Sequence, residues 1–228
     1  MKSIHAKRAV KTPLRLRMSA DCYLQKFIKY PRVAECHSWS ELLYLALLES
    51  DPSVTSFTPQ PERLKVNGRQ YIPDCFYVKN GERVYVELKP RGEFKDEIRL
   101  PLEDYAARYG CKFEVLANET ILKQVIKAKN WLHIIRTLVS ATHEDTSESE
   151  EWILEVLYYD RSLRIADVVD QFDRIGNRDK EIGLYRLAWE GLVHLELDEK
   201  PINCDTRVIC RQSAPTVERM KSNLLIGE

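Results

Sequence analysis

The chain has 228 residues, of which 44% are hydrophobic and 31% are charged. This composition is typical of a folded protein of one or two domains and excludes wholesale disorder. No apolar run reaches the roughly 20 residues of a membrane-spanning helix, and the N-terminus lacks the apolar core of a signal peptide. We therefore expect a cytoplasmic protein without membrane association.

The charges are unevenly distributed, although the formal net charge is zero. Residues 1–140 contain 24 Lys and Arg against 16 Asp and Glu, whereas residues 141–228 contain 11 against 19. Nine of the basic residues lie within positions 1–35, where only Asp21 and Glu35 are acidic. This basic N-terminal arm either neutralises phosphates or is simply solvated, and charge alone favours neither interpretation.

The cysteines and histidines give no sign of a zinc site. The six cysteines form no C-x-x-C pair, and the five histidines are scattered. We expect reduced thiols, most of them small core residues.

Apolar periodicity predicts an α/β domain in the first part of the chain. A Leu-rich helix is expected over Glu41–Glu49, because its apolar residues recur at three and four positions. Later expected elements are strands at Val54–Phe57, Arg63–Val66, Tyr71–Val78 and Arg83–Leu88, a helix over Phe94–Tyr109 bent at Pro101, a strand at Lys112–Ala117 and a helix over Thr120–Ser140. The strand–helix–strand order predicts a parallel pair within a mixed sheet flanked by helices.

Residues 141–150 carry four acidic and no basic side chains, which predicts a linker or exposed turn. We place an α/β domain at residues 1–142 and a small α+β domain at residues 151–228. Three helices, over 151–159, 162–172 and 178–190, then two strands, at 192–197 and 207–210, indicate a winged-helix-like fold. The third helix has three basic and three acidic residues, which favours binding to protein or weak contact with DNA over reading of the major groove.

A hairpin brings two carboxylates together in the first domain. Asn80 and Gly81 separate two strand-like runs, and such a pair predicts a type I′ turn. A two-residue loop sets Asp74 opposite Glu87 on one face, about 5 Å apart at Cβ. Lys89 lies two residues beyond Glu87 and points to the same face.

Two opposed carboxylates destabilise a sheet unless something compensates their charge. Mg²⁺ would do so, since it prefers hard oxygen ligands, and a neighbouring lysine can orient water or stabilise charge on phosphate. The alternative is a solvent-facing hairpin in which Lys89 neutralises one acid. Phe76, Val78 and Tyr85 share this face and indicate that it is at least partly covered.

Glu41 and Gln60 are ambiguous from the residues alone. Glu41 shares a helix face with Leu45 and Leu48, so it is a candidate inward-pointing carboxylate. Ser38 and Glu41 also match a capping box, and this structural interpretation is favoured. Gln60, between two prolines, lies in a stiff segment as either a turn residue or a group lining the site.

These residues resemble a nuclease family. Pro73-Asp74, twelve intervening residues and Glu87-Leu88-Lys89 match the PD-(D/E)xK motif, with Glu41 on the preceding helix. The surrounding SELLYLALLESDPSV, Gln60-Pro61, YIPD and YVELKP resemble TnsA, the endonuclease subunit of heteromeric cut-and-paste transposases. The resemblance covers about residues 35–117 well and the rest in outline.

The resemblance implies a restriction-endonuclease-like sheet and a metal-dependent DNA endonuclease. Asp74 and Glu87 would coordinate Mg²⁺, for which Mn²⁺ substitutes, while Glu41 would complete the acidic set and Lys89 would position the attacking water. Some family members carry Gln at the position of Glu87, which leaves Asp74 as the firmer ligand.

The implied substrate is double-stranded DNA at transposon ends, cleaved on the 5′ strands. The implied partners are a TnsB-type transposase and a TnsC-type AAA+ regulator, in a bacterial cytoplasm and on the nucleoid when DNA is bound. Two alternatives remain: a stand-alone restriction-like or junction-resolving nuclease, and a catalytically idle scaffold that bridges DNA and a regulator. The intact Asp74, Glu87 and Lys89 argue against the scaffold.

Overall fold

The computed structural model describes residues 21–170, 172–173 and 175–211. Residues 1–20, which hold most of the expected basic arm, and residues 212–228 lie outside the described residues. The chain forms two compact units, Met1–Ile135 and Arg136–Glu228, and the division falls within helix α5 (Val125–Ser140). Each unit is described by itself.

The first unit is built on a mixed four-stranded sheet with the order β3-β6-β7-β8. Its strands are β3 (Val54–Pro59), β6 (Cys75–Lys79), β7 (Glu82–Lys89) and β8 (Lys112–Ala117). The neighbours β7 and β8 are parallel and joined through α3 (Asp96–Arg108), as the sequence predicts, whereas the other pairs are antiparallel. The expected mixed α/β class is confirmed at this level.

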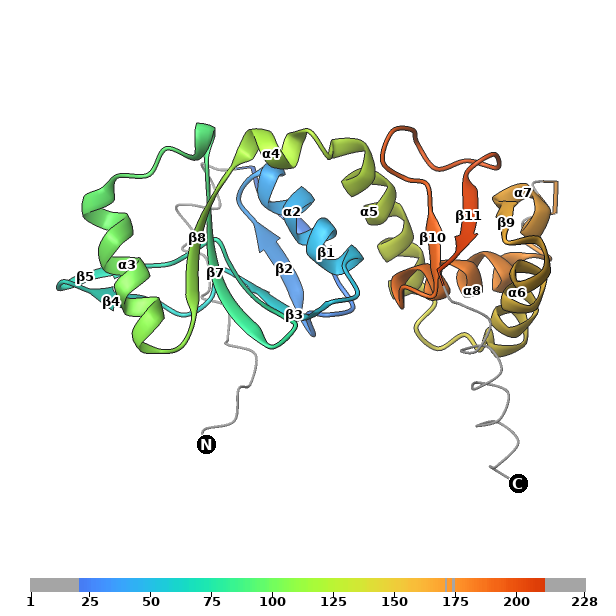
Figure 1. Ribbon diagram of the computed structural model, residues 1–228, viewed down its shortest axis with the longest axis horizontal. Helices are drawn as coiled ribbons and strands as arrows, with labels where there is room; N and C mark the ends of the chain where they lie inside the picture. The colour runs from blue at the N-terminus through green and yellow to red at the C-terminus, as the bar shows by residue number, and fades with distance from the viewer. Residues whose placement is uncertain (1–20, 171, 174, 212–228) are drawn as a thin grey trace, which may run out of the picture. The chain divides into compact units, whose positions relative to one another are not determined.

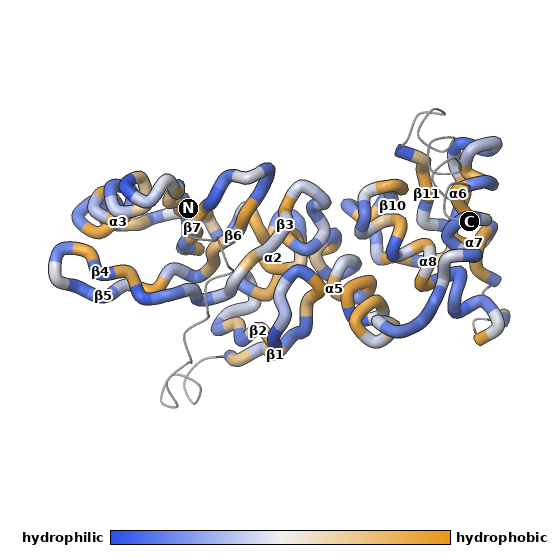
Figure 2. Tube along the Cα trace, turned by 90° about the horizontal axis from the view of Figure 1, so that it is seen from below, coloured by the Kyte–Doolittle hydropathy of each residue, from blue (hydrophilic) through white to orange (hydrophobic). Residues whose placement is uncertain are grey.

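Different elements cover the two faces of the sheet. Figure 1 shows α3 on one side and α2 (Trp39–Ser50) on the other. The perpendicular view in Figure 2 keeps α3 beside the hairpin of β4 (Leu64–Val66) and β5 (Arg69–Tyr71), away from α2. Phe76, Tyr85 and Phe113 of the sheet form a buried cluster with Leu102 and Ala106 of α3. The face that carries Phe76 and Tyr85 is therefore covered.

An additional hairpin precedes α2, in a region where the sequence predicts only a basic arm. Strands β1 (Tyr23–Lys26) and β2 (Val33–Cys36) pair antiparallel, so the part of the basic arm at residues 23–35 forms a hairpin. The turn between them buries Phe27 and Tyr30, whose rings lie 5.3 and 6.3 Å from that of Phe57. Aromatic burial thus outweighs the cationic composition of this segment.

Two elements expected as continuous are divided. The expected strand Tyr71–Val78 is split into β5 and β6 around Pro73, which has no N–H to donate to a ladder. The expected helix over 120–140 is split into α4 (Asn118–Leu122) and α5. A 3₁₀ turn, η1 (Pro90–Gly92), directly follows β7. Because the expected strand is interrupted at Pro73, Asp74 lies just outside the regular ladder. Its side chain therefore need not follow the alternation between faces that holds within a strand.

The second unit has the element order helix, strand, helix, helix, strand, strand. These elements are α6 (Ser147–Asp160), β9 (Ser162–Arg164), α7 (Ile165–Val168), α8 (Arg178–Trp189), β10 (Val193–Leu195) and β11 (Arg207–Cys210). The strands form one antiparallel sheet with the order β10-β11-β9. The expected helix over 162–172 is wrong in its first part, because residues 162–164 hydrogen-bond to β11 instead.

The acidic segment 141–150 is only partly the exposed linker that its composition predicts. Helix α6 begins at Ser147, and Thr146 is only 2% exposed. The guanidinium of Arg186 donates hydrogen bonds to the hydroxyl of Thr146 and to the carbonyl oxygens of Ala141 and Glu144. A long-range arginine contact, which composition does not show, packs the segment against α8.

None of the helices in the described ranges is both long and apolar enough to cross a membrane. The cysteines within those ranges are free thiols, and Cys36, Cys75 and Cys111 are buried. The expectation of small core thiols is confirmed for these three.

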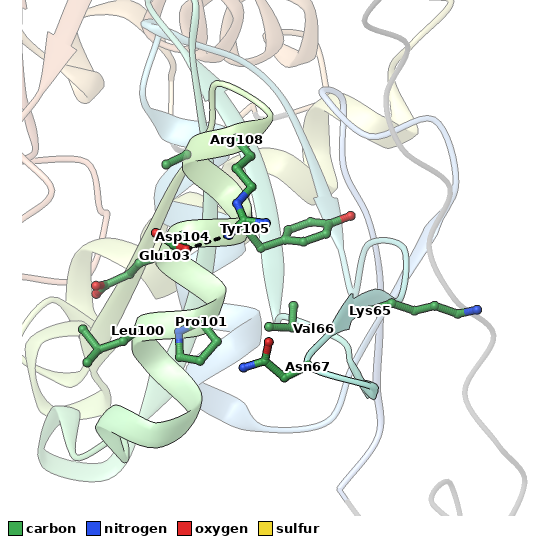
Figure 3. Close-up of a pocket in the computed structure, with 10 residues that line it drawn as sticks. Lys65, Val66, Asn67, Leu100, Pro101, Glu103, Asp104, Tyr105 and Arg108 are labelled. Atoms are coloured by element: carbon green, nitrogen blue, oxygen red, sulfur yellow. Dashed lines mark hydrogen bonds and ion pairs between the residues drawn. The ribbon is translucent and has the colours of Figure 1, made fainter.

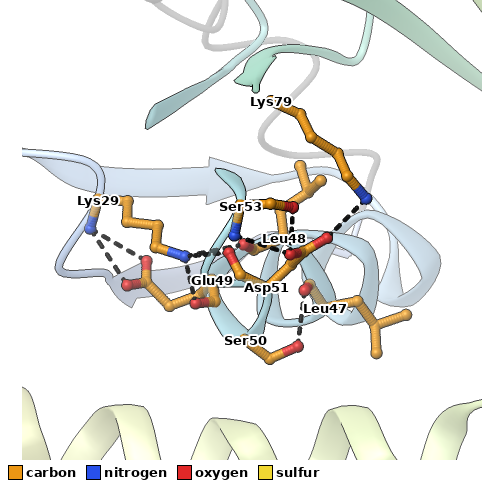
Figure 4. Close-up of polar contacts among 8 residues, drawn as sticks. All are labelled: Lys29, Leu47, Leu48, Glu49, Ser50, Asp51, Ser53 and Lys79. Carbon is orange, nitrogen blue, oxygen red and sulfur yellow. Dashed lines mark hydrogen bonds and ion pairs between the residues drawn. The ribbon is translucent and has the colours of Figure 1, made fainter. Parts of the chain in front are cut away.

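A lysine from the first hairpin caps the C-terminal end of α2 (Figure 4). The ammonium of Lys29 donates to the carbonyl oxygens of Glu49 and Asp51, each at 2.7 Å, and to that of Leu48 at 3.4 Å. The backbone N–H of Lys29 also donates to the fully buried carboxylate of Glu49. Burial lowers the pKa of Lys29, although the charges of Glu49 and Asp51 oppose this shift. Lys29 thus holds the hairpin against the helix end.

We expect Lys29→Met to lower the free energy of unfolding by about 2–3 kcal/mol, because helix carbonyl oxygens lose a charged donor. Urea denaturation measures this loss. The control is Lys79→Met, which removes an exposed ammonium from the same cluster. Lys79 lies 2.8 Å from Asp51 with its side chain 46% exposed, so its loss should cost below about 1 kcal/mol. Equal losses in the two variants would contradict the capping role.

Candidate metal centre

The hairpin turn has the predicted geometry. Asn80 has φ 48° and Gly81 has φ 80°, which are the two positive angles of a type I′ turn. The strands pair Lys79 with Glu82 and Phe76 with Tyr85, and the ladder ends at Cys75 with Val86. The rings of Phe76 and Tyr85 lie 4.9 Å apart, so the predicted register and shared face are confirmed up to that point.

Asp74 lies one residue beyond the ladder and bends toward the end of β7. Its Oδ2 accepts a 2.7 Å hydrogen bond from the backbone N–H of Leu88, and its carbonyl oxygen accepts one of 2.8 Å from the N–H of Gln60. Burial raises the pKa of Asp74 to about 8, with further contributions from the negative charges of Glu87 and Glu41. The three predicted carboxylates are therefore close enough for their charges to interact.

Glu87 lies in a strand that is paired on both sides, and it is only 3% exposed. One carboxylate oxygen, Oε1, accepts a hydrogen bond from the ammonium of Lys89. The other, Oε2, is buried without a hydrogen-bond partner among the described residues. Leaving a buried carboxylate oxygen without a partner costs free energy, so Oε2 is available to a further donor or to a cation.

Lys89 and an aromatic pair border the buried carboxylate. The Lys89 ammonium lies 5.5 Å from the ring centroid of Phe94, which in turn lies 5.9 Å from the ring of Tyr71. Burial, followed by the charge of Glu87, raises the pKa of Tyr71. The Tyr71 hydroxyl therefore stays protonated, and it is a proton donor next to the Glu87 carboxylate that no sequence motif singles out.

Glu41 forms half of the capping box that the sequence also allows, because its carboxylate accepts from the backbone N–H of His37 and not from that of the cap residue Ser38. Its backbone N–H donates to the Ser38 hydroxyl at 3.2 Å, while its carboxylate accepts from that hydroxyl at 3.1 Å and from the N–H of His37 at 2.9 Å. Both carboxylate oxygens thus have protein partners. Direct coordination of a cation by Glu41 would require at least one of these bonds to be released.

The residues fit a divalent cation in part. No group of three His, Cys, Asp or Glu side chains with metal-binding geometry occurs in the part of the chain that the structure describes. The site offers instead the pair Asp74 and Glu87, including the unsatisfied Oε2. This suffices for Mg²⁺, which usually takes one or two carboxylates and completes its shell with water and substrate phosphate.

A groove of about 620 Å³ lies elsewhere in the first unit, between α3 and the β4–β5 hairpin. Figure 3 shows its lining, which includes Lys65, Tyr105 and Arg108, with Arg108 paired to Asp104 along α3. None of the four predicted site residues lines it. The candidate chemistry thus depends on the acidic pair and not on this groove.

Gln60 is predicted as either a turn residue or a group lining the site, and no motif in the sequence singles out His37. In the structure the Gln60 side-chain nitrogen Nε2 lies 2.5 Å from Nδ1 of His37. Gln60 also has φ 43°, an uncommon left-handed angle for a residue other than glycine. In the sequence, the prolines on both sides of Gln60 are the signal that could have pointed to this residue, because they mark a constrained backbone.

No protein-family model matches the chain, and no curated protein matches it.

Proposed function

We propose that this chain is a metal-dependent DNA endonuclease. The observation that carries the proposal is the buried carboxylate of Glu87, which accepts a hydrogen bond from the Lys89 ammonium at one oxygen only and whose charge acts on Asp74. Opposed acids with an adjacent lysine suit metal-assisted hydrolysis of a phosphodiester. Burying a carboxylate oxygen without a partner costs free energy, and a bound cation would offset that cost.

Each side chain has a distinct role in the proposed reaction. Asp74 and Glu87 would hold Mg²⁺, or Mn²⁺ in its place, and Glu41 adds negative charge beside them. The metal would lower the pKa of a bound water and stabilise charge on the phosphate. Lys89 would position the attacking water and stabilise the developing negative charge, because its ammonium already lies against Glu87.

The resemblance to TnsA extends the proposal to a restriction-endonuclease-like fold and to cleavage at transposon ends. On this proposal the DNA would be cut on its 5′ strands, with a TnsB-type transposase and a TnsC-type AAA+ regulator as partners. The support in the first unit is the mixed sheet, with the acidic hairpin leading into a parallel β7–β8 pair.

For the second unit we propose a winged-helix-like domain. Its helix–strand–helix–helix–strand–strand order and its three-stranded sheet support this assignment. The cations of α8 have partners within the unit: Arg178 binds Glu144 at 2.9 Å, Arg186 donates to segment 141–146, and Lys180 lies 4.9 Å from the Trp152 ring. Because these cations are already paired within the unit, α8 is better suited to protein binding or weak DNA contact than to reading of the major groove.

Calorimetric titration with Mn²⁺ tests the metal site without the proposed partners. We expect the wild-type chain to bind Mn²⁺ and Asp74→Ala to lose this binding, because the half-satisfied Glu87 alone cannot replace the pair. Asp104→Ala is the matched control, since Asp104 is an exposed acid of α3 paired with Arg108. Equal binding by Asp74→Ala and wild type would refute the metal site. Cleavage of plain plasmid DNA by the pure chain would favour a stand-alone nuclease.

A further inference from the structure

Gln60 holds a left-handed backbone at the end of β3. Its φ of 43° is unfavourable for a residue with a Cβ, and Pro59 and Pro61 restrict the backbone on both sides. Pro59 forms the last pair of the β3–β6 ladder, opposite Cys75. The strained residue therefore lies next to the point where the chain reaches Asp74.

Hydrogen bonds from Gln60 lead to two of the carboxylate-bearing segments. Its backbone N–H donates to the carbonyl oxygen of Asp74 at 2.8 Å. Its side-chain Nε2 lies 2.5 Å from Nδ1 of His37, whose own N–H donates to the Glu41 carboxylate at 2.9 Å. A continuous chain of contacts thus runs from Asp74 through Gln60 and His37 to Glu41.

We propose that Gln60 and His37 form a positioning pair, which fixes the start of α2, with Glu41, against the segment that carries Asp74. The inference deepens the proposed function and rests on it. Once Asp74 is ionised, as binding of a cation requires, Asp74 and Glu41 carry like charges, which favour separation of the two segments. A hydrogen bond between the segments opposes that separation, and residues that orient metal-binding groups in this way commonly set metal affinity.

The Gln60→Gly variant separates positioning from folding. Glycine adopts a positive φ without a steric penalty, so the N–H bond to Asp74 and the backbone conformation are retained. Only the side chain that reaches His37 is removed. We expect a melting temperature equal to or above that of wild type, together with about tenfold weaker Mn²⁺ affinity. Replacing a residue that has only a structural role would not lower the Mn²⁺ affinity while leaving the melting temperature unchanged.

Asn67→Gly is the matched control. Asn67 has φ 48° in the β4–β5 turn, so glycine relieves the same backbone conformation away from the carboxylates. We expect its melting temperature to change as in Gln60→Gly and its Mn²⁺ affinity to equal that of wild type. The partner variant His37→Ala should weaken Mn²⁺ binding to the same degree, and the double variant should lose no more than either single one.

Hydrogen exchange at the His37 amide gives a readout that needs no metal. This amide donates to Glu41, and we expect it to exchange faster in Gln60→Gly than in Asn67→Gly. Unchanged exchange or unchanged Mn²⁺ affinity in Gln60→Gly would overturn the positioning pair. Failure of the wild type to bind Mn²⁺ would count against the proposed function instead, while the exchange rates would still decide whether the pair restrains Glu41.

Discussion

Replacing Lys89 with methionine is expected to slow DNA cleavage by about 10²–10⁴-fold while leaving Mn²⁺ affinity equal or higher. The rate falls because the ammonium that would orient water and stabilise charge is lost. Affinity does not fall, because the same ammonium competes with a divalent cation for the carboxylate of Glu87. The cleavage rate is measured in a single-turnover assay on duplex DNA that carries a transposon end, with the chain and its proposed partner proteins together. Calorimetry measures the Mn²⁺ affinity.

Lys112→Met controls for the loss of a lysine–glutamate pair as such. Lys112 lies 2.8 Å from Glu82, so this ion pair joins β8 to the opposite end of the strand that carries Glu87. Both partners are exposed, and we expect neither cleavage nor Mn²⁺ affinity to change. If Lys89→Met cleaves at the wild-type rate, Lys89 has no part in the reaction. If it loses Mn²⁺ binding instead, Lys89 supports the site structurally.

Mn²⁺ affinity is expected to rise roughly 50-fold between pH 6 and pH 8 and to level off above about pH 9. Burial and the neighbouring carboxylates raise the pKa of Asp74 to about 8, so below that pH a cation must displace a proton. Each pH unit below the pKa then weakens binding about tenfold. Calorimetry across this range measures the slope. A flat profile would contradict protonation of Asp74, and Asp74→Asn should bind weakly at every pH.

The same carboxyl group is expected to destabilise the metal-free fold at alkaline pH. Because its pKa is raised in the folded state, that state holds an extra proton between about pH 4 and pH 8, and the free energy of unfolding falls as pH rises through this window. Asparagine is isosteric and carries no charge. Asp74→Asn should therefore melt at a higher temperature than wild type at pH 9 and at a similar temperature at pH 4. Thermal melting curves of both proteins, recorded without metal at the two pH values, test the direction of this difference.

The hairpin at the centre of the site was predictable because local rules determine it. Asn80 and Gly81 specify the turn, and a two-residue loop then fixes the strand register by counting. The order β7–α3–β8 likewise follows from a short strand on each side of one helix. These elements depend on neighbours close in sequence, which composition and periodicity show directly.

Elements held by distant contacts were not predictable in the same way. The β1–β2 hairpin is held by burial of Phe27 and Tyr30 against Phe57, about 30 residues downstream. Ser162–Arg164 is a strand only because β11 pairs with it more than 40 residues later. The contact between His37 and Gln60 also joins segments that are separate in sequence, so no periodic pattern predicts it.

The two-residue turn also limits how the chain can change in length over evolution. Glu87 lies in β7, whose side chains alternate between faces, and the turn at Asn80 and Gly81 fixes the register of β7 against β6. Inserting or deleting a single residue in β7 before Glu87 would turn its carboxylate to the face covered by α2. Tolerated insertions should therefore come in pairs, be absorbed by a bulge, or fall before Asp74, in the hairpin of β4 and β5.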